Sequence, residues 1–309
     1  MKNIVVIGGG TGTSLVLQGL KKYPVHLSAV VSTADDGGST GRLREQLGGV
    51  PVGDIRACLL ALSNALPIVK EQMAHRWENG HVAMNVALAQ YQDRYGIQAA
   101  ISHFVRFLKV KGEVIPVTLK GTKLSAVLQN GQMIRGEHNI NLHEKSVKIS
   151  KIKLSPSKAN PAALRAIKKA NLIVFAPGDI YTSILPNVLV PGIAKAIARS
   201  SAKKVIVVNF LRQKGHTDRF QVVDFVELLE EYLHSPIDIA IVNTEKPKIE
   251  KNNFVEPKID PLLKRGVQVI TSPLLSQTLI KQSKADKLKR SKILHDPKKL
   301  GKIIYKLVN

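Results

Sequence analysis

The sequence is poor in cysteine and in long apolar runs, and each shortage excludes a class of protein. Cys58 is the only cysteine among 309 residues, so an intramolecular disulfide is excluded and a cytoplasmic location is favoured. Its apolar neighbours indicate a core residue rather than a nucleophile. The longest nearly uncharged stretch, Ala170 to Ala194, contains Asp179 and three prolines, and the N-terminal apolar run has four residues. Neither a membrane span nor a signal peptide is expected.

Acidic residues are also scarce relative to basic ones: 23 against 46, for a formal net charge of +23. The segment Lys281 to Lys306 alone holds ten basic and two acidic residues. Such a field attracts nucleic acid or an anionic membrane. However, lysines outnumber arginines 33 to 13 and aromatics are only 5%, whereas base readout and single-strand binding use arginine forks and stacking aromatics. Specific nucleic-acid binding is therefore not expected, and the charge is interpreted as solvated lysine faces.

Short apolar runs alternate with helical patterns through most of the chain. This alternation predicts a Rossmann-like α/β fold, with a mostly parallel sheet and helices on both faces. Strands are expected at Asn3–Ile7, His26–Val31, Leu172–Ala176, Val205–Asn209, Ile237–Val242 and Val267–Ile270. Helices are expected at Ser14–Lys22, Arg42–Leu47, Ile55–Ala65, Ile68–Trp77, Val82–Tyr95, Ala162–Ala170, Pro186–Ser200, Gln221–His234 and Pro297–Leu307.

A β-rich insert is expected at about residues 101–154. Asn130-Gly131 separates two strand-like segments and is a strong hairpin signal. Val147–Leu154 alternates apolar residues with lysine, as a half-exposed strand does. Residues 1–309 are interpreted as a single domain that carries this insert and a basic C-terminal segment at about 281–309. A homo-oligomer is compatible with the sequence.

A glycine-rich loop, Gly8-Gly9-Gly10-Thr11-Gly12-Thr13, follows the first expected strand directly. Glycines allow backbone N–H groups to approach a ligand, and the start of the next helix favours an anion. The loop therefore predicts a phosphate site, with a tight turn and no ligand as the alternative. Thr13 breaks the dinucleotide fingerprint that would begin at Gly8, and the P-loop pattern is absent.

Two carboxylates, Asp35 and Asp36, stand beside Gly37 after the second expected strand, at the sheet edge where ligands bind. Asp36 is the candidate ligand for Mg²⁺, which would bridge phosphates. The alternative is that one carboxylate caps the following helix and the other is solvated. Arg42 and Arg56 are candidate phosphate clamps, with ordinary ion pairs as the alternative.

Later polar residues have similar double interpretations. His81 is an acid–base group or phosphate donor, or a structural hydrogen-bonding residue. Asp54 is equally a helix N-cap or a ligand contact. Thr182 and Ser183 supply hydroxyls to phosphate or to local capping. Asn187 and Asn209 follow strands closely, and their amides suit base or ribose recognition.

Five motifs in order carry a resemblance to a known family, from residue 3 to about 245. They are the glycine loop, ADDGGSTGRLRE at Ala34–Glu45, PVGDIR at Pro51–Arg56, the pair His81 and Asn85, and PGDIYTSILPNVLVPGI at Pro177–Ile193 followed by VNF. The chain resembles the bacterial gluconeogenesis-factor proteins (YvcK-like), relatives of the 2-phospho-L-lactate transferase CofD. The resemblance implies nucleotide or phosphate contacts at Gly8, Gly9, Gly10, Thr11, Gly12, Thr13, Asp35, Asp36, Gly37, Arg42, Asp54, Arg56, His81, Asn85, Gly178, Tyr181, Thr182, Asn187 and Asn209.

The same resemblance implies a function. In the YvcK-like branch the ligand is a nucleotide sugar such as UDP-GlcNAc, and the protein is a cytoplasmic regulator needed for cell shape and wall synthesis on gluconeogenic carbon sources. In the transferase branch a phospholactyl group passes from a guanosine diphosphate carrier to a deazaflavin, with a divalent metal. The loops around Asp36 and Tyr181 side with the first branch; the metal-dependent phosphoryl-group transferase is the alternative.

Departures from the family pattern fall at three places. Asp179 replaces the serine after Pro-Gly, and its carboxylate would repel a phosphate unless a metal or a cation lies between them. Gly80-His81-Val82-Ala83-Met84-Asn85 keeps only the glycine, histidine and asparagine of GHSLGN. Phe254 and Leu294 stand where the uridine-sugar branch has tyrosine and arginine, so weak binding of a UDP-sugar is expected.

Overall fold

A seven-stranded sheet forms the centre of the computed structural model, which describes residues 1–143, 147–279 and 291–308. The strand order is β10-β9-β8-β7-β1-β2-β3, and every neighbouring pair is parallel. The strands are β1 (Lys2–Gly8), β2 (Val25–Val31), β3 (Glu113–Pro116), β7 (Leu172–Phe175), β8 (Lys203–Val207), β9 (Ile239–Asn243) and β10 (Gln268–Ser272). The predicted Rossmann-like fold is thereby confirmed.

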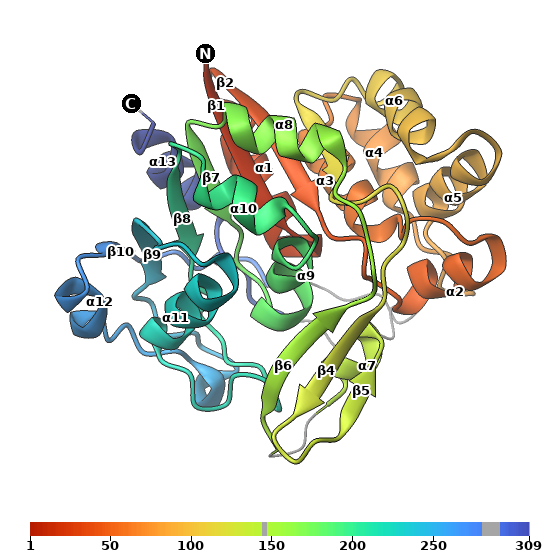
Figure 1. Ribbon diagram of the computed structural model, residues 1–309. Helices are drawn as coiled ribbons and strands as arrows, with labels where there is room; N and C mark the ends of the chain where they lie inside the picture. Colours follow the sequence, from red (N-terminus) through yellow and green to blue (C-terminus); the bar gives the residue numbers. More distant parts are fainter. Residues whose placement is uncertain (144–146, 280–290, 309) are drawn as a thin grey trace.

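Helices cover both faces of this sheet because its central strands are apolar on both sides (Figure 1). Along β1, Ile4 and Val6 pack into one core and Val5 and Ile7 into the other. The first core includes α1 (Gly10–Leu20), α3 (Gly53–Leu62), α5 (Ala83–Tyr95), α6 (Ile97–Phe107) and α13 (Pro297–Lys306). The second includes α8 (Pro161–Lys169), α10 (Ile193–Ala198) and α11 (Val222–Leu233).

Several helices begin earlier than the sequence predicts. α1 starts at Gly10 rather than Ser14, so the glycine loop supplies its first turn. α2 spans Gly38–Leu47 and starts within the acidic loop. α3 starts at Gly53, which places Asp54 in the first turn and makes Val52 the N-cap, so the predicted N-cap at Asp54 is wrong. Glycine hides these starts because its helix propensity is low.

The long helix predicted at Pro186–Ser200 is broken in the structure. A π-helix at Ile180–Ile184 leads into α9 (Leu185–Val188), and α10 follows after Gly192. α9 has its C-cap at Leu189, and Gly192, with a left-handed φ of +93°, is the N-cap of α10. The remaining short elements are α4 (Pro67–Ala74), α12 (Asp260–Lys264) and a 3₁₀ turn at Lys251–Asn253.

The β-rich insert is smaller than predicted. Residues 101–116 belong to α6 and β3 of the main fold, and the antiparallel sheet β5-β4-β6 lies within residues 124–154. Its strands are β4 (Leu124–Leu128), β5 (Met133–Arg135) and β6 (Ile149–Leu154), and the turn at Asn130-Gly131 joins β4 to β5 as predicted. A short helix, α7 (Glu137–Asn141), follows β5. Figure 1 shows the insert at the end of the molecule opposite both termini.

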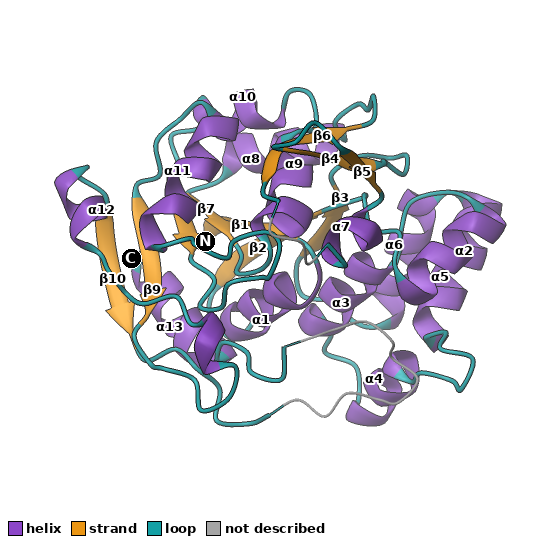
Figure 2. Cartoon of the chain, turned by 90° about the horizontal axis from the view of Figure 1, so that it is seen from below, coloured by secondary structure: helices purple, strands orange, loops and turns teal. Residues whose placement is uncertain are grey.

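The C-terminal helix α13 packs on α1 (Figure 2). Gly19 and Gly301 allow this approach, since a Cβ on Gly19 would lie 1.9 Å from the Pro297 carbonyl oxygen. Part of the predicted basic segment, residues 280–290 and 309, lies outside the described residues. Within the described part of the chain, no helix is both long and apolar enough to cross a membrane.

Candidate functional site

Four loops that the sequence marks for function leave the same edge of the parallel sheet, and the start of α3 adjoins one of them. The glycine loop follows β1, the acidic loop follows β2, the loop at Pro177 follows β7, and Asn209 follows β8. Gly53 at the start of α3 adjoins the acidic loop, since a Cβ there would lie 3.0 Å from an Asp35 carboxylate oxygen. Because these strands are parallel, their carboxyl ends meet at one edge, which is the usual ligand-binding edge of such sheets.

The glycine loop is wound tightly onto the end of β7. A Cβ on Gly12 would lie 1.6 Å from the Pro177 carbonyl oxygen, so only glycine fits there. Gly10 has φ +55°, and the N-cap Gly9 offers no side-chain acceptor to α1. The first N–H groups of a helix have no intrahelical partner, so this geometry presents donors at the edge. Thr13, in contrast, is fully buried and belongs to the packing of the loop.

The carboxylates near this loop lie at the starts of helices. Asp36 accepts hydrogen bonds from the backbone N–H groups of His138, at 2.7 Å, and Glu137, at 3.2 Å, so it caps α7. Asp35 accepts from the Gly37 N–H at 2.9 Å and adjoins the start of α3. Asp54 lies against the glycine loop, 2.5 Å from where a Cβ of Gly9 would be. Helix dipoles stabilise carboxylates at these positions.

The hydrogen bonds of Asp36 are relevant to its predicted role as a ligand for Mg²⁺. Both oxygens of Asp36 accept backbone N–H groups of α7, a helix about a hundred residues later, and not of the helix that follows it. Within residues 1–143, 147–279 and 291–308, no group of three or more His, Cys, Asp or Glu residues is placed to hold a metal ion. The described side chains by themselves therefore do not form a metal centre.

Glu137 joins the acidic loop from the insert, and the sequence analysis missed it. Burial raises the pKa of its carboxyl well above the usual 4.5, and the nearby charges of Asp35, Asp54 and Asp36 raise it further. Asn141 donates a hydrogen bond to Glu137. The site thus contains one carboxyl group whose protonated form is favoured. No sequence signal marks it, because α7 has a single turn and no apolar periodicity.

Asp179 and His216 form a buried pair beneath the loop at Pro177. The His216 Nδ1 lies 2.8 Å from Asp179 Oδ2, and its Nε2 lies 2.7 Å from the Ile140 carbonyl oxygen. A carboxylate oxygen and a carbonyl oxygen carry no hydrogen, so both ring nitrogens of His216 donate. The ring is therefore an imidazolium. Burial opposes this charge, but Asp179 and the two hydrogen bonds raise the pKa of His216 above 6.5. His216 therefore supplies the positive charge that neutralises the Asp179 carboxylate.

Thr182 and Asn141 extend this network. The Thr182 backbone N–H lies 2.8 Å from Asp179 Oδ1 and the Thr182 hydroxyl lies 3.1 Å from it, and both can donate to this oxygen. Asp179 thus caps the start of the π-helix. The Thr182 hydroxyl also lies 3.0 Å from Asn141 Oδ1, and Gln213 Nε2 donates to the same oxygen. The insert helix α7 is therefore tied at its start to Asp36 and at its end to the loops after β7 and β8.

His81 and Asn85 converge on Ser39 at the start of α2. The Ser39 hydroxyl oxygen accepts from Asn85 Nδ2 at 3.2 Å and from the Val82 N–H at 3.4 Å, and it lies 3.1 Å from His81 Nδ1. Its one hydrogen thus goes to His81 Nδ1, which places the ring proton on Nε2. Burial lowers the pKa of His81, and the charge of Arg42 lowers it further, so the neutral ring is favoured.

Several residues that are predicted to contact a ligand also have partners within the protein. Asn187 is fully buried, and its Nδ2 donates to the carbonyl oxygens of Gly8, at 3.3 Å, and Ser183, at 2.9 Å. Tyr181 is a core residue whose ring lies edge-on to His216, with centroids 6.0 Å apart. Arg42 is exposed and donates to the Asn79 carbonyl oxygen at 2.7 Å.

The other predicted residues lie at the same edge. Gly178 begins the loop after β7, Arg56 lies in the first turns of α3, and Asn209 is half-buried just after β8. Arg44, which the sequence analysis passed over, donates to the Thr122 carbonyl oxygen at 2.7 Å and reaches the Asp35 carbonyl at 3.4 Å. It fastens the acidic loop to the segment that leads into β4.

Comparisons with known proteins agree on the family. Residues 4–275 match the family of the 2-phospho-L-lactate transferase CofD. A gluconeogenesis factor of Listeria innocua is 41% identical, with 88% of each chain covered, and one of Halalkalibacterium halodurans is 39% identical, covering 85% of this chain and 84% of that one. A solved structure, a UPF0052 family protein from Bacillus halodurans, superposes with a TM-score of 0.89 at 34% identity, covering 98% and 99% of the two chains.

The match extends through the sheet, the four edge loops and the start of α3, up to β10 and a few residues beyond. Relatives well above 30% identity span most of the chain and carry one name. The protein is therefore a member of the CofD family and resembles, within it, the proteins named gluconeogenesis factor.

Proposed function

We propose that this protein is a regulatory protein that binds a nucleotide sugar of the UDP-GlcNAc type in the cytoplasm. One observation carries the proposal: α1 and α2 both begin with glycine at adjacent strand ends, and neither N-cap residue supplies a side-chain cap. Two such helix starts side by side favour a diphosphate, because each presents N–H donors and a positive dipole end.

The surrounding charges define what must accompany the ligand. Asp35 and Asp54 adjoin the starts of α3 and α1, so they would face the phosphates of a ligand bound there. We therefore propose that Mg²⁺ enters together with the nucleotide, since Mg²⁺ is commonly held by one or two carboxylates and substrate phosphates rather than by a protein cage. Binding should then weaken strongly when the divalent cation is removed.

A regulatory binding function is favoured over group transfer because several polar side chains of the site form hydrogen bonds within the protein that hold its loops. Asp36, Asp179 and Asn187 have internal partners, as described above. The specific observation for the alternative, a metal-dependent phosphoryl-group transferase, is Glu137, a carboxyl group whose pKa is raised beside three other carboxylates. Transfer of a phospholactyl group to a deazaflavin acceptor would decide for that alternative.

The direct test is calorimetric titration with UDP-GlcNAc, UDP and GDP, each with and without Mg²⁺. We expect UDP-GlcNAc to bind more tightly than GDP. Its affinity should nevertheless be weak, in the high-micromolar range, because Phe254 and Leu294 replace residues that make contacts in the uridine-sugar branch. Loss of one charge-assisted contact costs roughly 10- to 150-fold in affinity. Tighter Mg²⁺-dependent binding of GDP would contradict the proposal.

A loop variant tests the phosphate position. Gly9 has an extended backbone, φ −141°, that alanine also adopts, but the added methyl would lie 2.5 Å from an Asp54 carboxylate oxygen. Gly9→Ala should therefore fold normally and lose at least tenfold in nucleotide affinity, because the methyl disturbs the space between loop and carboxylate. Gln18→Ala, on the exposed face of the same helix, is the matched control and should bind like the wild type.

The cellular part of the proposal concerns cell shape and wall synthesis during growth on gluconeogenic carbon. The name shared by the relatives, gluconeogenesis factor, supports the link to gluconeogenic carbon, and the link to cell shape and wall synthesis is a proposal. In a bacterial strain that lacks its own such factor, this chain should restore growth and normal shape on a gluconeogenic carbon source. The Gly9→Ala variant should fail to do so. Equal rescue by both would separate the cellular role from nucleotide binding.

A further inference from the structure

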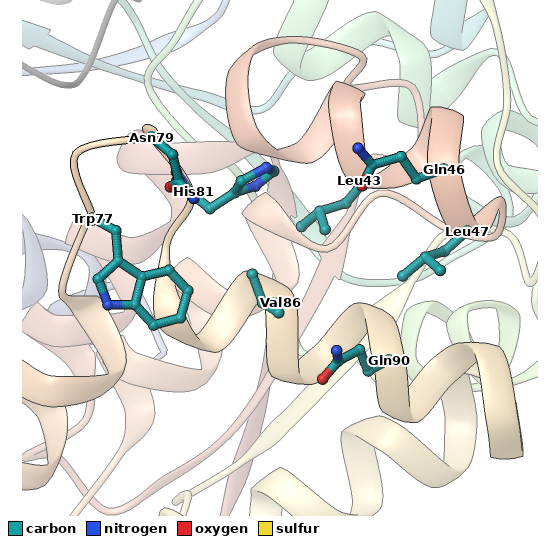
Figure 3. A pocket seen from close by; sticks show the side chains of 8 residues that line it. All are labelled: Leu43, Gln46, Leu47, Trp77, Asn79, His81, Val86 and Gln90. Atoms are coloured by element: carbon teal, nitrogen blue, oxygen red, sulfur yellow. The ribbon is translucent and has the colours of Figure 1, made fainter.

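A pocket of about 340 Å³ lies along the second half of α2, lined there by Leu43, Gln46 and Leu47. Figure 3 shows its walls: one side comes from α2, one from α5, and one from the turn that precedes α5. The lining residues are Leu43, Gln46, Leu47, Trp77, Asn79, His81, Val86 and Gln90. We call this cavity the Trp77 pocket.

The turn that carries Trp77 is held firmly in place. The backbone N–H of Trp77 donates to the His81 carbonyl oxygen at 2.9 Å, and Arg76 Nη1 donates to the Gly80 carbonyl oxygen at 2.8 Å. Two further contacts tie the turn to α2, from Arg42 to the Asn79 carbonyl oxygen and from Ser39 to the His81 ring. The pocket is therefore preformed, which reduces the entropy cost of binding.

The lining chemistry selects for an uncharged ring with hydroxyl groups. Trp77 is 43% exposed, so part of its indole is open to a ligand, and Leu43 and Val86 add apolar surface. Three side-chain amides, of Gln46, Asn79 and Gln90, offer donors and acceptors, and the lining contains no lysine, arginine or carboxylate. The Asn79 Oδ1 accepts the backbone N–H of His81 at 3.0 Å, and the amide groups of the lining favour a ligand with hydroxyls over a purely aliphatic one. A sugar ring has one apolar face for the indole and hydroxyls for the amides.

The part of the pocket nearest to the start of α2 is formed by His81. His81 lines the pocket, and its Nδ1 is bonded to Ser39 in the first turn of α2. A ligand whose diphosphate lies at the start of α2 would therefore reach the pocket past His81. We propose that the Trp77 pocket holds the sugar ring of the nucleotide sugar, with the indole as the stacking surface and the amides as hydroxyl partners; this rests on the proposed function above.

Trp77 is the only tryptophan of the chain, so its fluorescence reports the pocket directly. UDP-GlcNAc should change the tryptophan emission of the protein. UDP, which lacks the N-acetylglucosamine ring, should bind without changing it. Trp77→Ala should lower the affinity for UDP-GlcNAc about tenfold by calorimetry and leave the affinity for UDP unchanged. Trp77→Phe, which keeps a flat ring, should retain most of the affinity.

Controls separate the two proposals. Tyr95→Ala removes another exposed aromatic ring, at the far end of α5, and should bind both ligands like the wild type. If UDP and UDP-GlcNAc bind the wild type and Trp77→Ala binds both equally well, the Trp77 pocket is not the sugar site, although nucleotide binding stands. If neither ligand binds the wild type, with or without Mg²⁺, the proposed function fails and this inference fails with it.

Discussion

At the scale of single residues, the pair Asp179 and His216 shows how one side chain determines the need for another. Their side chains are 7% and 0% exposed, so each charge depends on the other for its solvation. Removing one partner of a buried ion pair leaves the other charge uncompensated and costs about 3–5 kcal/mol. The pair also joins the insert to the loop after β7 through the Ile140 carbonyl.

The pH dependence of stability follows from this pair. Burial opposes both charges, but the mutual attraction lowers the pKa of Asp179 below 3.8 and raises that of His216 above 6.5. The contribution of His216 is complete below pH 6.5 and is lost as the pH rises through its raised pKa. That of Asp179 is complete above pH 3.8 and is lost as the pH falls through its lowered pKa.

We therefore expect urea unfolding to show the largest free energy of unfolding between these two limits. His216→Ala should lower this free energy by about 3–5 kcal/mol near pH 6 and should flatten its decline at higher pH. An unchanged pH profile in the variant would show that the imidazolium assignment is wrong.

At the scale of elements, α7 is too short to be stable by itself and depends on its caps. Asp36→Ala removes the acceptor of two N–H groups at its start, so we expect a loss of about 0.5–2 kcal/mol. The loss should be local: hydrogen exchange should accelerate at Glu137–Asn141 and not in β1. Asp93→Ala, at an exposed position on α5, is the control. Faster exchange throughout the sheet would argue against a capping role.

The contact between α1 and α13 gives a second prediction for an element. A Cβ on Gly19 would meet the Pro297 carbonyl oxygen at 1.9 Å, and backbone cannot move aside as a flexible side chain does. Gly19→Ala should lower the free energy of unfolding by about 1–3 kcal/mol. Gln18→Ala, one residue away and exposed, should change it by less than about 0.5 kcal/mol. Equal effects in a urea titration would mean that α13 does not pack closely on α1.

At the scale of the whole molecule, Cys58 reports global unfolding. Its thiol is fully buried on α3, and burial, with the charge of Asp54, raises its pKa well above 9.0. A thiol reagent should therefore label the native protein only through unfolding, at a rate that rises with urea in parallel with the unfolded fraction. Rapid labelling of protein with a native circular dichroism spectrum would show that α3 opens locally.

The fold could be predicted largely because its strands are apolar and alternate with helices. β1, β2 and β7 each lie within one or two residues of their predicted bounds, and the Asn130-Gly131 hairpin is where the dipeptide indicates it. Helix starts at glycine were predicted too late, and the break at Gly192 was missed. These errors share a cause: local propensity disfavours glycine in helices, whereas the tertiary structure places Gly10, Gly38 and Gly192 in a left-handed conformation that favours glycine.

The sequence by itself determined the sheet, the edge where the loops gather and the family, because periodicity and loop motifs are local properties of the chain. It could not show which polar side chains face a ligand. The structure decided that Asp36 caps a helix about a hundred residues away, that His216 neutralises Asp179, and that Glu137 reaches the acidic loop from the insert. The Trp77 pocket likewise needs two helices and a turn. Such contacts arise only when distant segments pack together, so tertiary structure assigns each polar group its partner.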